Sequence, residues 1–244
     1  MFGFNFDRRI LYGVFIALII YSLMGMTREA WISMLLTLPA VIIAITIHEF
    51  SHAKTADVLG DKTPRSQGRL TLNPLSHLDP FGFVLLMFAH VGWGKPVEIN
   101  PNNFTSNKSK SACEAMVSLA GPVSNLILAF LLILVSRLIS VWAPSLGDTF
   151  YGYILLLLIE ITIIVNIGLG VFNLIPLPPL DGEKIFKSIL PYRAQQWLDR
   201  NSYILSVIFI VLWITGTLGN LVSPIISIIE QGMVKLVLLL TSWI

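Results

Sequence analysis

The chain has 244 residues, of which 55% are hydrophobic and only 12% are charged, whereas about 25% of the residues in a soluble domain carry charge. A chain this apolar cannot cover itself with polar groups, so lipid is the expected solvent. The formal net charge is only +2 and no long run of Lys or Arg occurs, which excludes the basic surface of a nucleic-acid binder. The single Cys113 excludes an internal disulfide and a cysteine-based metal cluster.

Apolar blocks long enough to cross a hydrocarbon core of about 30 Å predict an all-α polytopic membrane protein with about six transmembrane helices. We place them near Ile10–Met24, Trp31–His52, Cys113–Leu138, Tyr153–Leu174, Tyr203–Thr217 and Leu218–Leu240. The first resembles a signal-peptide core, but no small-x-small cleavage site follows it, so we expect it to be retained. Only Gly216 to Gly219 separate the last two stretches, which predicts a tight C-terminal helical hairpin over about 201–244.

The longest region without a span lies between the second and third stretches, from about Asp57 to Ala112. Within it, Phe81–Val91 is apolar but too short to cross, and is expected to be re-entrant or interfacial. Gly94–Asn100 alternates polar and apolar residues, which favours an edge strand near the membrane surface. We therefore expect a re-entrant or β-hairpin-like insertion here. The whole chain, 1–244, is predicted to be one membrane-embedded domain with its core at about 31–190.

The positions of Lys and Arg residues predict how the chain is oriented. With the N-terminus in the cytoplasm, almost all of them fall in cytoplasmic loops, and only Arg28 and Arg137 fall outside. The loop between the third and fourth stretches, which contains Ser145, is then expected outside. This asymmetry predicts that both termini are cytoplasmic, in a multi-pass protein of the cell membrane of a prokaryote.

The second stretch carries an H-E-x-x-H motif formed by His48, Glu49 and His52. On a helix the two histidines lie about 40° apart on one face, one turn from each other, so both imidazoles can bind one metal ion. Glu49 points beside that face, where it can act as a general base on an attacking water. The non-catalytic alternative is a helix that ends at this motif, with its three polar groups reaching the cytoplasmic interface.

A catalytic zinc usually has three protein ligands, so a third is needed. Asp57 is disfavoured because nine residues of helix place it on the face opposite His48. Asp181 is the better candidate, since it follows a proline-rich turn directly after a spanning helix. Irregular backbone at membrane depth is tolerated where it is buried in protein or lines a water-filled cavity, although Asp-Gly is also an ordinary turn pair.

These motifs resemble the site-2 protease family of intramembrane zinc metalloproteases over most of residues 40–190. The resemblance rests on the H-E-x-x-H motif, the spacing of Gly121 and Asn125, and the N-x-x-P-x-P-x-x-D-G form of Asn173–Gly182. It implies a Zn²⁺ cofactor held by His48, His52 and Asp181, and Glu49 as the catalytic acid/base. It also implies a place near the site for Asn173, with Gly121 and Asn125 as substrate-facing or supporting residues. Many relatives carry a PDZ module or a C-terminal regulatory domain, and neither fits in this chain.

Two further features of the spans have more than one interpretation. Asn166 and Asn173 lie seven residues apart on one face and are candidates to line a cavity together, or Asn166 bonds a neighbouring helix. Gly121 and Asn125 either permit close helix approach near the metal or serve packing alone.

The resulting functional expectation is a zinc metalloendopeptidase that cuts membrane-spanning substrate proteins, as in regulated intramembrane proteolysis. The attacking water is expected to enter from the cytoplasm, and Lys95–Asn100 to hold an unwound substrate segment as an added strand. One rival is a metal-ion or proton transporter, which would also place His, Glu and Asp at membrane depth, but the paired repeats common in transporters are not visible. The other rival is an inactive membrane-binding protein that keeps the fold.

Overall fold

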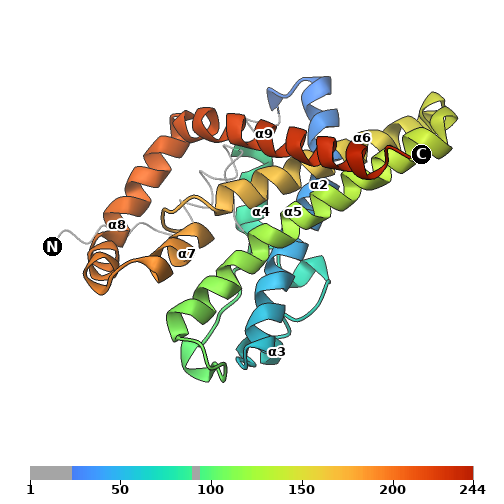
Figure 1. Ribbon diagram of the computed structural model, residues 1–244. Helices are drawn as coiled ribbons and strands as arrows, with labels where there is room; N and C mark the ends of the chain where they lie inside the picture. Colours follow the sequence, from blue (N-terminus) through green and yellow to red (C-terminus); the bar gives the residue numbers. More distant parts are fainter. Residues whose placement is uncertain (1–23, 90–93, 244) are drawn as a thin grey trace.

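The computed structural model describes residues 24–89 and 94–243, and within them the chain folds into α-helices and short 3₁₀ turns without a β-strand. In chain order the helices are α2 (Arg28–Val58), α3 (Thr63–Ser66), α4 (Pro80–Ala89), α5 (Lys110–Trp142), α6 (Phe150–Asn173), α7 (Asp181–Ile189), α8 (Tyr192–Ile214) and α9 (Thr217–Leu240) (Figure 1). Short 3₁₀ turns cover Pro74–Ser76, Pro101–Asn103 and Pro144–Asp148.

Five helices, α2, α5, α6, α8 and α9, are long and apolar enough to cross a membrane. They correspond to the last five predicted spans, while the first prediction falls outside the described residues except for Met24. The helices begin where the sequence offers hydroxyl caps: Thr27, Ser109 and Thr149 each accept a hydrogen bond from a backbone N–H of the first turn. The all-helical membrane fold is thus confirmed in its class.

Two predictions for the insertion between α2 and α5 have different outcomes. The edge strand at Gly94–Asn100 is wrong, because Gly94 makes only an isolated antiparallel bridge with Leu78 and the residues after it are irregular. The backbone N–H groups of Lys95, Val97 and Asn100 donate to a loop carbonyl and to two side-chain carboxylates, so they are not available to a neighbouring strand. Helix α4 is short, as expected of a segment that cannot cross, and its re-entrant placement remains a prediction.

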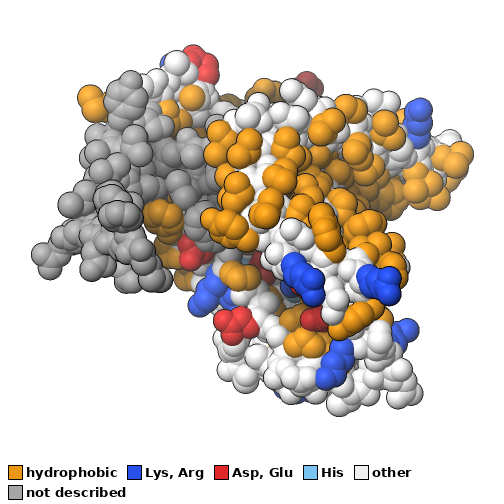
Figure 2. Space-filling view, turned by 90° about the vertical axis from the view of Figure 1, so that its left-hand side faces the viewer, with side chains coloured by type: hydrophobic (Ala, Val, Ile, Leu, Met, Phe, Trp, Pro, Cys, Tyr) orange, Lys and Arg blue, Asp and Glu red, His pale blue; other side chains and the backbone are white. Residues whose placement is uncertain are grey.

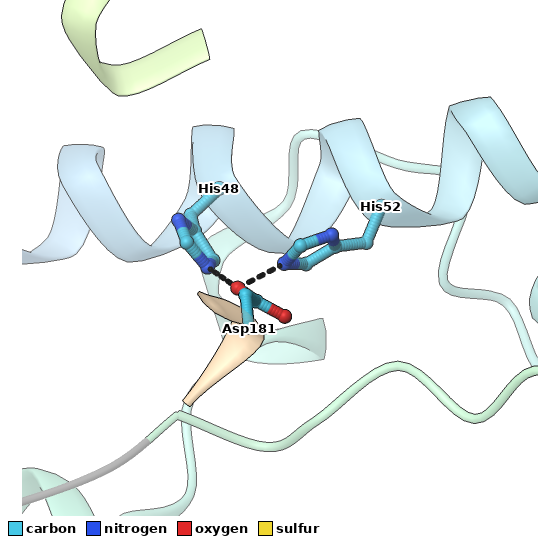
Figure 3. A group of neighbouring side chains, drawn as sticks. All are labelled: His48, His52 and Asp181. Atoms are coloured by element: carbon cyan, nitrogen blue, oxygen red, sulfur yellow. Dashed lines mark hydrogen bonds and ion pairs between the residues drawn. The ribbon is translucent and has the colours of Figure 1, made fainter. Parts of the chain in front are cut away.

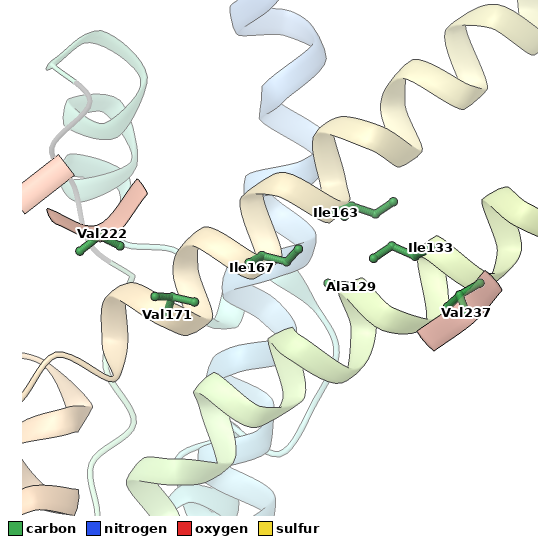
Figure 4. Close-up of a cluster of buried hydrophobic side chains, with 7 residues drawn as sticks. All are labelled: Ala129, Ile133, Ile163, Ile167, Val171, Val222 and Val237. Carbon is green, nitrogen blue, oxygen red and sulfur yellow. The ribbon is translucent and has the colours of Figure 1, made fainter. Parts of the chain in front are cut away.

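The centre of the fold is formed by α2, α5 and α6, which pack against one another (Figure 1). A cluster of small and branched apolar side chains joins α5, α6 and α9 (Figure 4): Ala129, Ile133, Ile163, Ile167, Val171, Val222 and Val237. Gly170 of α6 faces the Pro122 carbonyl of α5, where an added Cβ would lie 3.0 Å from that oxygen. Small residues at such contacts let helices approach closely, which is the usual way that helices associate in lipid.

Helix α9 lies beside α5 and α6 rather than beside α8. Figure 4 shows Val222, early in α9, near Val171 at the end of α6, and Val237 near Ile133 of α5. At the far end Arg137 donates to the Thr241 hydroxyl over 3.5 Å. The predicted tight link is present at Gly216, whose φ is +74°, but α8 and α9 diverge from it instead of packing as a hairpin (Figure 1).

Both ends of α8 are attached to the end of the molecule where α6 stops and α7 begins. An ion pair between Lys187 and Asp199 ties the first half of α8 to α7. Near the end of α8, the Phe209 and Trp213 rings contact the Phe172 ring of α6 in edge-to-face and tilted arrangements. The end of α9 therefore lies at the same end of the molecule as residues 143–149, beside the C-terminus of α5 (Figure 1). The sequence predicts a cytoplasmic C-terminus and an outer 143–149 loop. Because both lie at the same end of the molecule, only one of these two predictions can hold.

The outer surfaces of the long helices carry large exposed apolar side chains, among them Ile127, Leu131, Ile164 and Leu239. Figure 2 shows apolar side chains over the upper part of one face, with many of the charged side chains gathered below them. A surface of this kind suits contact with lipid on its apolar part and with water on its charged part.

Candidate metal centre

The H-E-x-x-H motif lies in α2, as its apolar surroundings predict. His48 and His52 are only 6% and 7% exposed, and their ring centroids lie 4.6 Å apart in an edge-to-face arrangement. The one-turn spacing brings both Nε2 atoms to the same side of the helix (Figure 3). The helix therefore continues past the motif and both histidines are buried, in contrast to the alternative of a helix that ends at the motif with its polar groups at the interface.

Asp181 reaches these two histidines from the opposite side, at the first residue of α7 (Figure 3). Its Oδ2 lies 3.1 Å from the Nε2 of His48 and 3.1 Å from the Nε2 of His52. The proline-containing turn after α6 folds tightly against Gly182, where an added Cβ would lie 2.3 Å from the Ile175 carbonyl oxygen. The turn thus delivers a residue far away in the sequence to the helix that carries the motif.

The other ring nitrogen of each histidine has a partner that selects its tautomer. His48 Nδ1 lies 2.7 Å from Asn125 Oδ1, and His52 Nδ1 lies 2.7 Å from the Val117 carbonyl oxygen. Both partners accept hydrogen bonds, so each Nδ1 carries the proton and each Nε2 keeps a free lone pair. Supporting acceptors of this kind are typical of metal-binding histidines.

Asn125 of α5 is fully buried and belongs to a chain of amides. Its Nδ2 donates to the Ala44 carbonyl over 3.0 Å and to Asn166 Oδ1 over 2.8 Å, which leaves Oδ1 for His48. Asn166 in turn donates to the Thr162 carbonyl of its own helix over 2.8 Å. Of the two interpretations of Asn166, the interhelical hydrogen bond is therefore the one observed.

Gly121, also on α5, lies directly against the two imidazoles. A Cβ added there would lie 2.5 Å from His52 Nε2 and 2.7 Å from His48 Cε1, closer than real side chains approach. Glycine at this position is therefore more than a packing residue between helices, because a larger residue would displace both rings.

The remaining predicted residues lie in different surroundings. Glu49 is partly buried, and its Oε2 accepts a hydrogen bond from the Val97 backbone N–H over 3.1 Å. Asn173 donates to the Leu169 carbonyl of its own helix, and no hydrogen bond within the described residues joins it to the cluster. Asp57, in the last turn of α2, pairs with Arg65 and Lys62 and is not a member of the cluster, as its helical phase predicts. Sequence reasoning missed Val117, because a backbone carbonyl leaves no trace in residue types.

The cluster suits zinc by the chemistry of its donors. One candidate ligand atom from each of His48, His52 and Asp181 lies within 4.8 Å of the others. Two neutral imidazoles and one carboxylate form a set that zinc enzymes use while a fourth position stays open. An aspartate carboxyl is ordinarily ionised at neutral pH, so Asp181 supplies an anionic oxygen that faces the two Nε2 lone pairs.

Comparison with known proteins agrees with this chemistry. The family model of peptidase family M50 matches residues 139–215, a stretch that contains Asp181 but not the H-E-x-x-H motif. "Putative zinc metalloprotease YwhC" of Bacillus subtilis (strain 168) is 36% identical over 204 residues, which is 80% of this chain and 88% of that protein. "Putative zinc metalloprotease Rip2" of Mycolicibacterium smegmatis is 32% identical over 192 residues, 76% of this chain and 69% of that protein. No solved structure matches the chain significantly.

The chain therefore belongs to peptidase family M50, the site-2 protease family that its motifs resemble. It is a zinc metalloprotease with several membrane-spanning helices, similar in sequence to the Bacillus and mycobacterial proteins along most of its length.

Proposed function

We propose that this metalloprotease hydrolyses peptide bonds of membrane-spanning proteins, with His48, His52 and Asp181 as the zinc ligands and Glu49 as the general base. The observation that carries the proposal is the convergence of two imidazole Nε2 atoms and one carboxylate oxygen beside Glu49. A bound zinc would supply a Lewis acid that polarises the scissile carbonyl and makes a water acidic enough to attack at a pH of about 7.

The protein residues around the cluster have separate tasks in this proposal. The Asn125 and Val117 acceptors hold the two histidines in the tautomer that binds a cation. Glu49 follows His48 directly in α2 but is not a member of the His48–His52–Asp181 cluster, so its carboxylate is left for proton transfer. It would take the proton from the attacking water and then deliver it to the leaving amine nitrogen.

The place of the site in the fold supports a membrane substrate. His48 and His52 lie within α2, an apolar helix long enough to cross a membrane, whose outer surface is exposed and apolar in part. The end of α2 and the segment after it carry Lys54, Lys62 and Arg65, which favours the cytoplasmic side of a prokaryotic cell membrane for the site and its water.

The test compares the wild type with Glu49→Gln in proteoliposomes. The probe is a panel of fluorescent reporter peptides, each with one transmembrane segment interrupted by an Asn-Pro pair at a different depth. Wild-type protein should cut at least one reporter, whereas Glu49→Gln should bind zinc normally and lose at least about 100-fold in rate. Equal cleavage by both proteins, or no reporter cut by the wild type, would contradict the proposal.

A parallel zinc-flux measurement on the same vesicles addresses the transporter alternative. We expect no flux above that of empty vesicles. Flux that His48→Ala abolishes would favour transport over proteolysis.

A further inference from the structure

Residues 95–100 form a strap that is hydrogen-bonded to the Glu49 carboxylate. The Lys95 N–H donates to the His77 carbonyl over 2.8 Å, and the Asn100 N–H donates to Asp61 Oδ2 over 2.7 Å. Between these two anchors, the Val97 N–H donates to Glu49 Oε2 over 3.1 Å. One oxygen of the Glu49 carboxylate is therefore held by the strap, while its Oε1 has no such donor among the described residues.

The strap is held on its other side by Arg69. This side chain is only 4% exposed, and its Nη2 donates to the Lys95 carbonyl over 2.5 Å and to the Pro96 carbonyl over 2.6 Å. The Arg69 backbone is itself fixed, because its N–H donates to the Pro64 carbonyl over 2.9 Å. A rigid cation thus bonds two consecutive carbonyls of the strap.

The Pro96 carbonyl and the Val97 N–H belong to the same peptide group. Arg69 bonds the oxygen of this peptide group and Glu49 bonds its N–H, so a cation and an anion lie at the two ends of one peptide dipole. A cation on the carbonyl polarises the peptide and strengthens its N–H as a donor. The arrangement couples Arg69 to Glu49 without direct contact.

The charge of Arg69 is not explained by stability of the fold alone. Within residues 24–89 and 94–243 no carboxylate forms an ion pair with it, and its buried Nη1 has no hydrogen-bond partner. A buried cation without a counter-charge is unfavourable, and neutral donors could tether a loop as well. The cation is therefore placed where its field acts on the peptide group that contacts Glu49.

We propose that Arg69 is a positioning residue that orients the Glu49 carboxylate through the Pro96–Val97 peptide. With Oε2 held by Val97, the carboxylate presents Oε1 to the attacking water and does not rotate. The inference rests on the proposed role of Glu49 as general base. Loss of Arg69 should slow turnover without changing zinc content, since its hydrogen bonds go to the Lys95 and Pro96 carbonyls and not to the zinc ligands. Because Arg69 is buried, substrate affinity should also stay unchanged.

The test uses Arg69→Met and Arg69→Lys, with Arg65→Met as the matched control. Both carbonyls are bonded by a single nitrogen of Arg69, so the lysine ammonium can replace it, whereas methionine cannot. Arg65 lies in the same loop but pairs with Asp57. For the reporter peptide, kcat should fall about tenfold or more in Arg69→Met, with KM within about twofold of wild type. Arg69→Lys should recover most of the loss, and Arg65→Met should resemble wild type.

Amide hydrogen exchange supplies a readout that needs no substrate. Exchange across residues 95–100 should rise about tenfold or more in Arg69→Met and stay near the wild-type rate in Arg69→Lys. Val97→Pro, which removes the N–H that bonds Glu49, should reproduce the kcat loss, and the double variant with Arg69→Met should be no slower than either single variant. This second route decides the matter if Arg69→Met fails to fold or loses zinc.

The outcomes separate this inference from the proposed function. If Glu49→Gln is inactive but Val97→Pro and Arg69→Met turn over normally, only the positioning role is overturned. If Glu49→Gln retains wild-type activity, the general-base assignment fails and the inference fails with it. Faster turnover in Arg69→Met would also overturn the inference, because it would show that the strap restrains catalysis.

Discussion

The three-helix centre and the C-terminal arm of this protease are built in different ways. In α2, α5 and α6 the contacts combine glycine against imidazole, a chain of buried amides and close helix approach. In α8 and α9 most residues are exposed, and only Phe209, Leu218, Val222 and Val237 are buried. In the centre, the identity of individual residues is therefore set by contacts around the candidate metal site. In the C-terminal arm, α8 and α9, most positions require only an apolar side chain. Equivalent substitutions in the two regions should therefore have unequal effects.

Glycine substitution should show the largest difference. Gly121→Ala puts a Cβ 2.5 Å from His52 Nε2, so we expect at least about 100-fold weaker zinc binding and loss of reporter cleavage. Gly232→Ala in α9 meets nothing within 4 Å and should behave as wild type. Zinc titration against a fluorescent chelator measures both variants. Wild-type zinc affinity in Gly121→Ala would show that the rings are free to move.

Asparagine substitution should give the next largest contrast. Asn125→Ala removes the acceptor that holds His48 Nδ1, and zinc affinity should fall about 10- to 100-fold. Asn220→Ala changes an exposed amide early in α9 and should alter zinc affinity by less than about twofold. The same titration applies. Equal affinities for the two variants would mean that the amide chain supports the helices and not the metal.

Apolar truncation compares the two regions in stability. Ile167→Ala creates a cavity in the fully buried cluster between α5 and α6 and should destabilise the protein by about 2–5 kcal/mol. Ile210→Ala in α8 removes a side chain that is 47% exposed and should change stability by less than about 0.5 kcal/mol. Thermal unfolding in detergent with zinc present gives both values. A larger loss for Ile210→Ala would mean that α8 packs against a surface outside the described residues.

Much of the centre could be predicted from sequence because its chemistry depends on residue types and spacing. The one-turn separation of His48 and His52 and the proline-rich turn before Asp181 are visible in the residues. The Val117 carbonyl and the Val97 N–H could not be predicted, since backbone groups at a site depend on how distant segments fold. The strand at 94–100 was wrong for the same reason, because its N–H groups bond side chains and loop carbonyls.

The direction of α9 could not be read from hydropathy. Hydropathy predicts that an apolar helix of sufficient length crosses the membrane completely, but α8 is tied to the α6–α7 end at both of its ends. With Cys113 replaced by Ser, cysteines at Ser145 and Ser242 should therefore react with an impermeant thiol reagent from the same side of the membrane. Cysteines at Lys62 and Lys187 should react from the other side. If the cysteines at Ser145 and Ser242 were labelled from opposite sides, the result would contradict this arrangement and support the predicted hairpin of α8 and α9.

The central claim, that His48, His52 and Asp181 hold the zinc, is tested most directly by zinc K-edge X-ray absorption on the purified protein. We expect about one zinc per chain with two imidazole ligands, at least one further oxygen and no sulfur, at distances of about 2.0–2.2 Å. His48→Ala with His52→Ala should remove the imidazole contribution and the stoichiometric zinc, while Asp57→Asn should leave both unchanged. A sulfur ligand, or full zinc retained in the double histidine variant, would contradict the assignment.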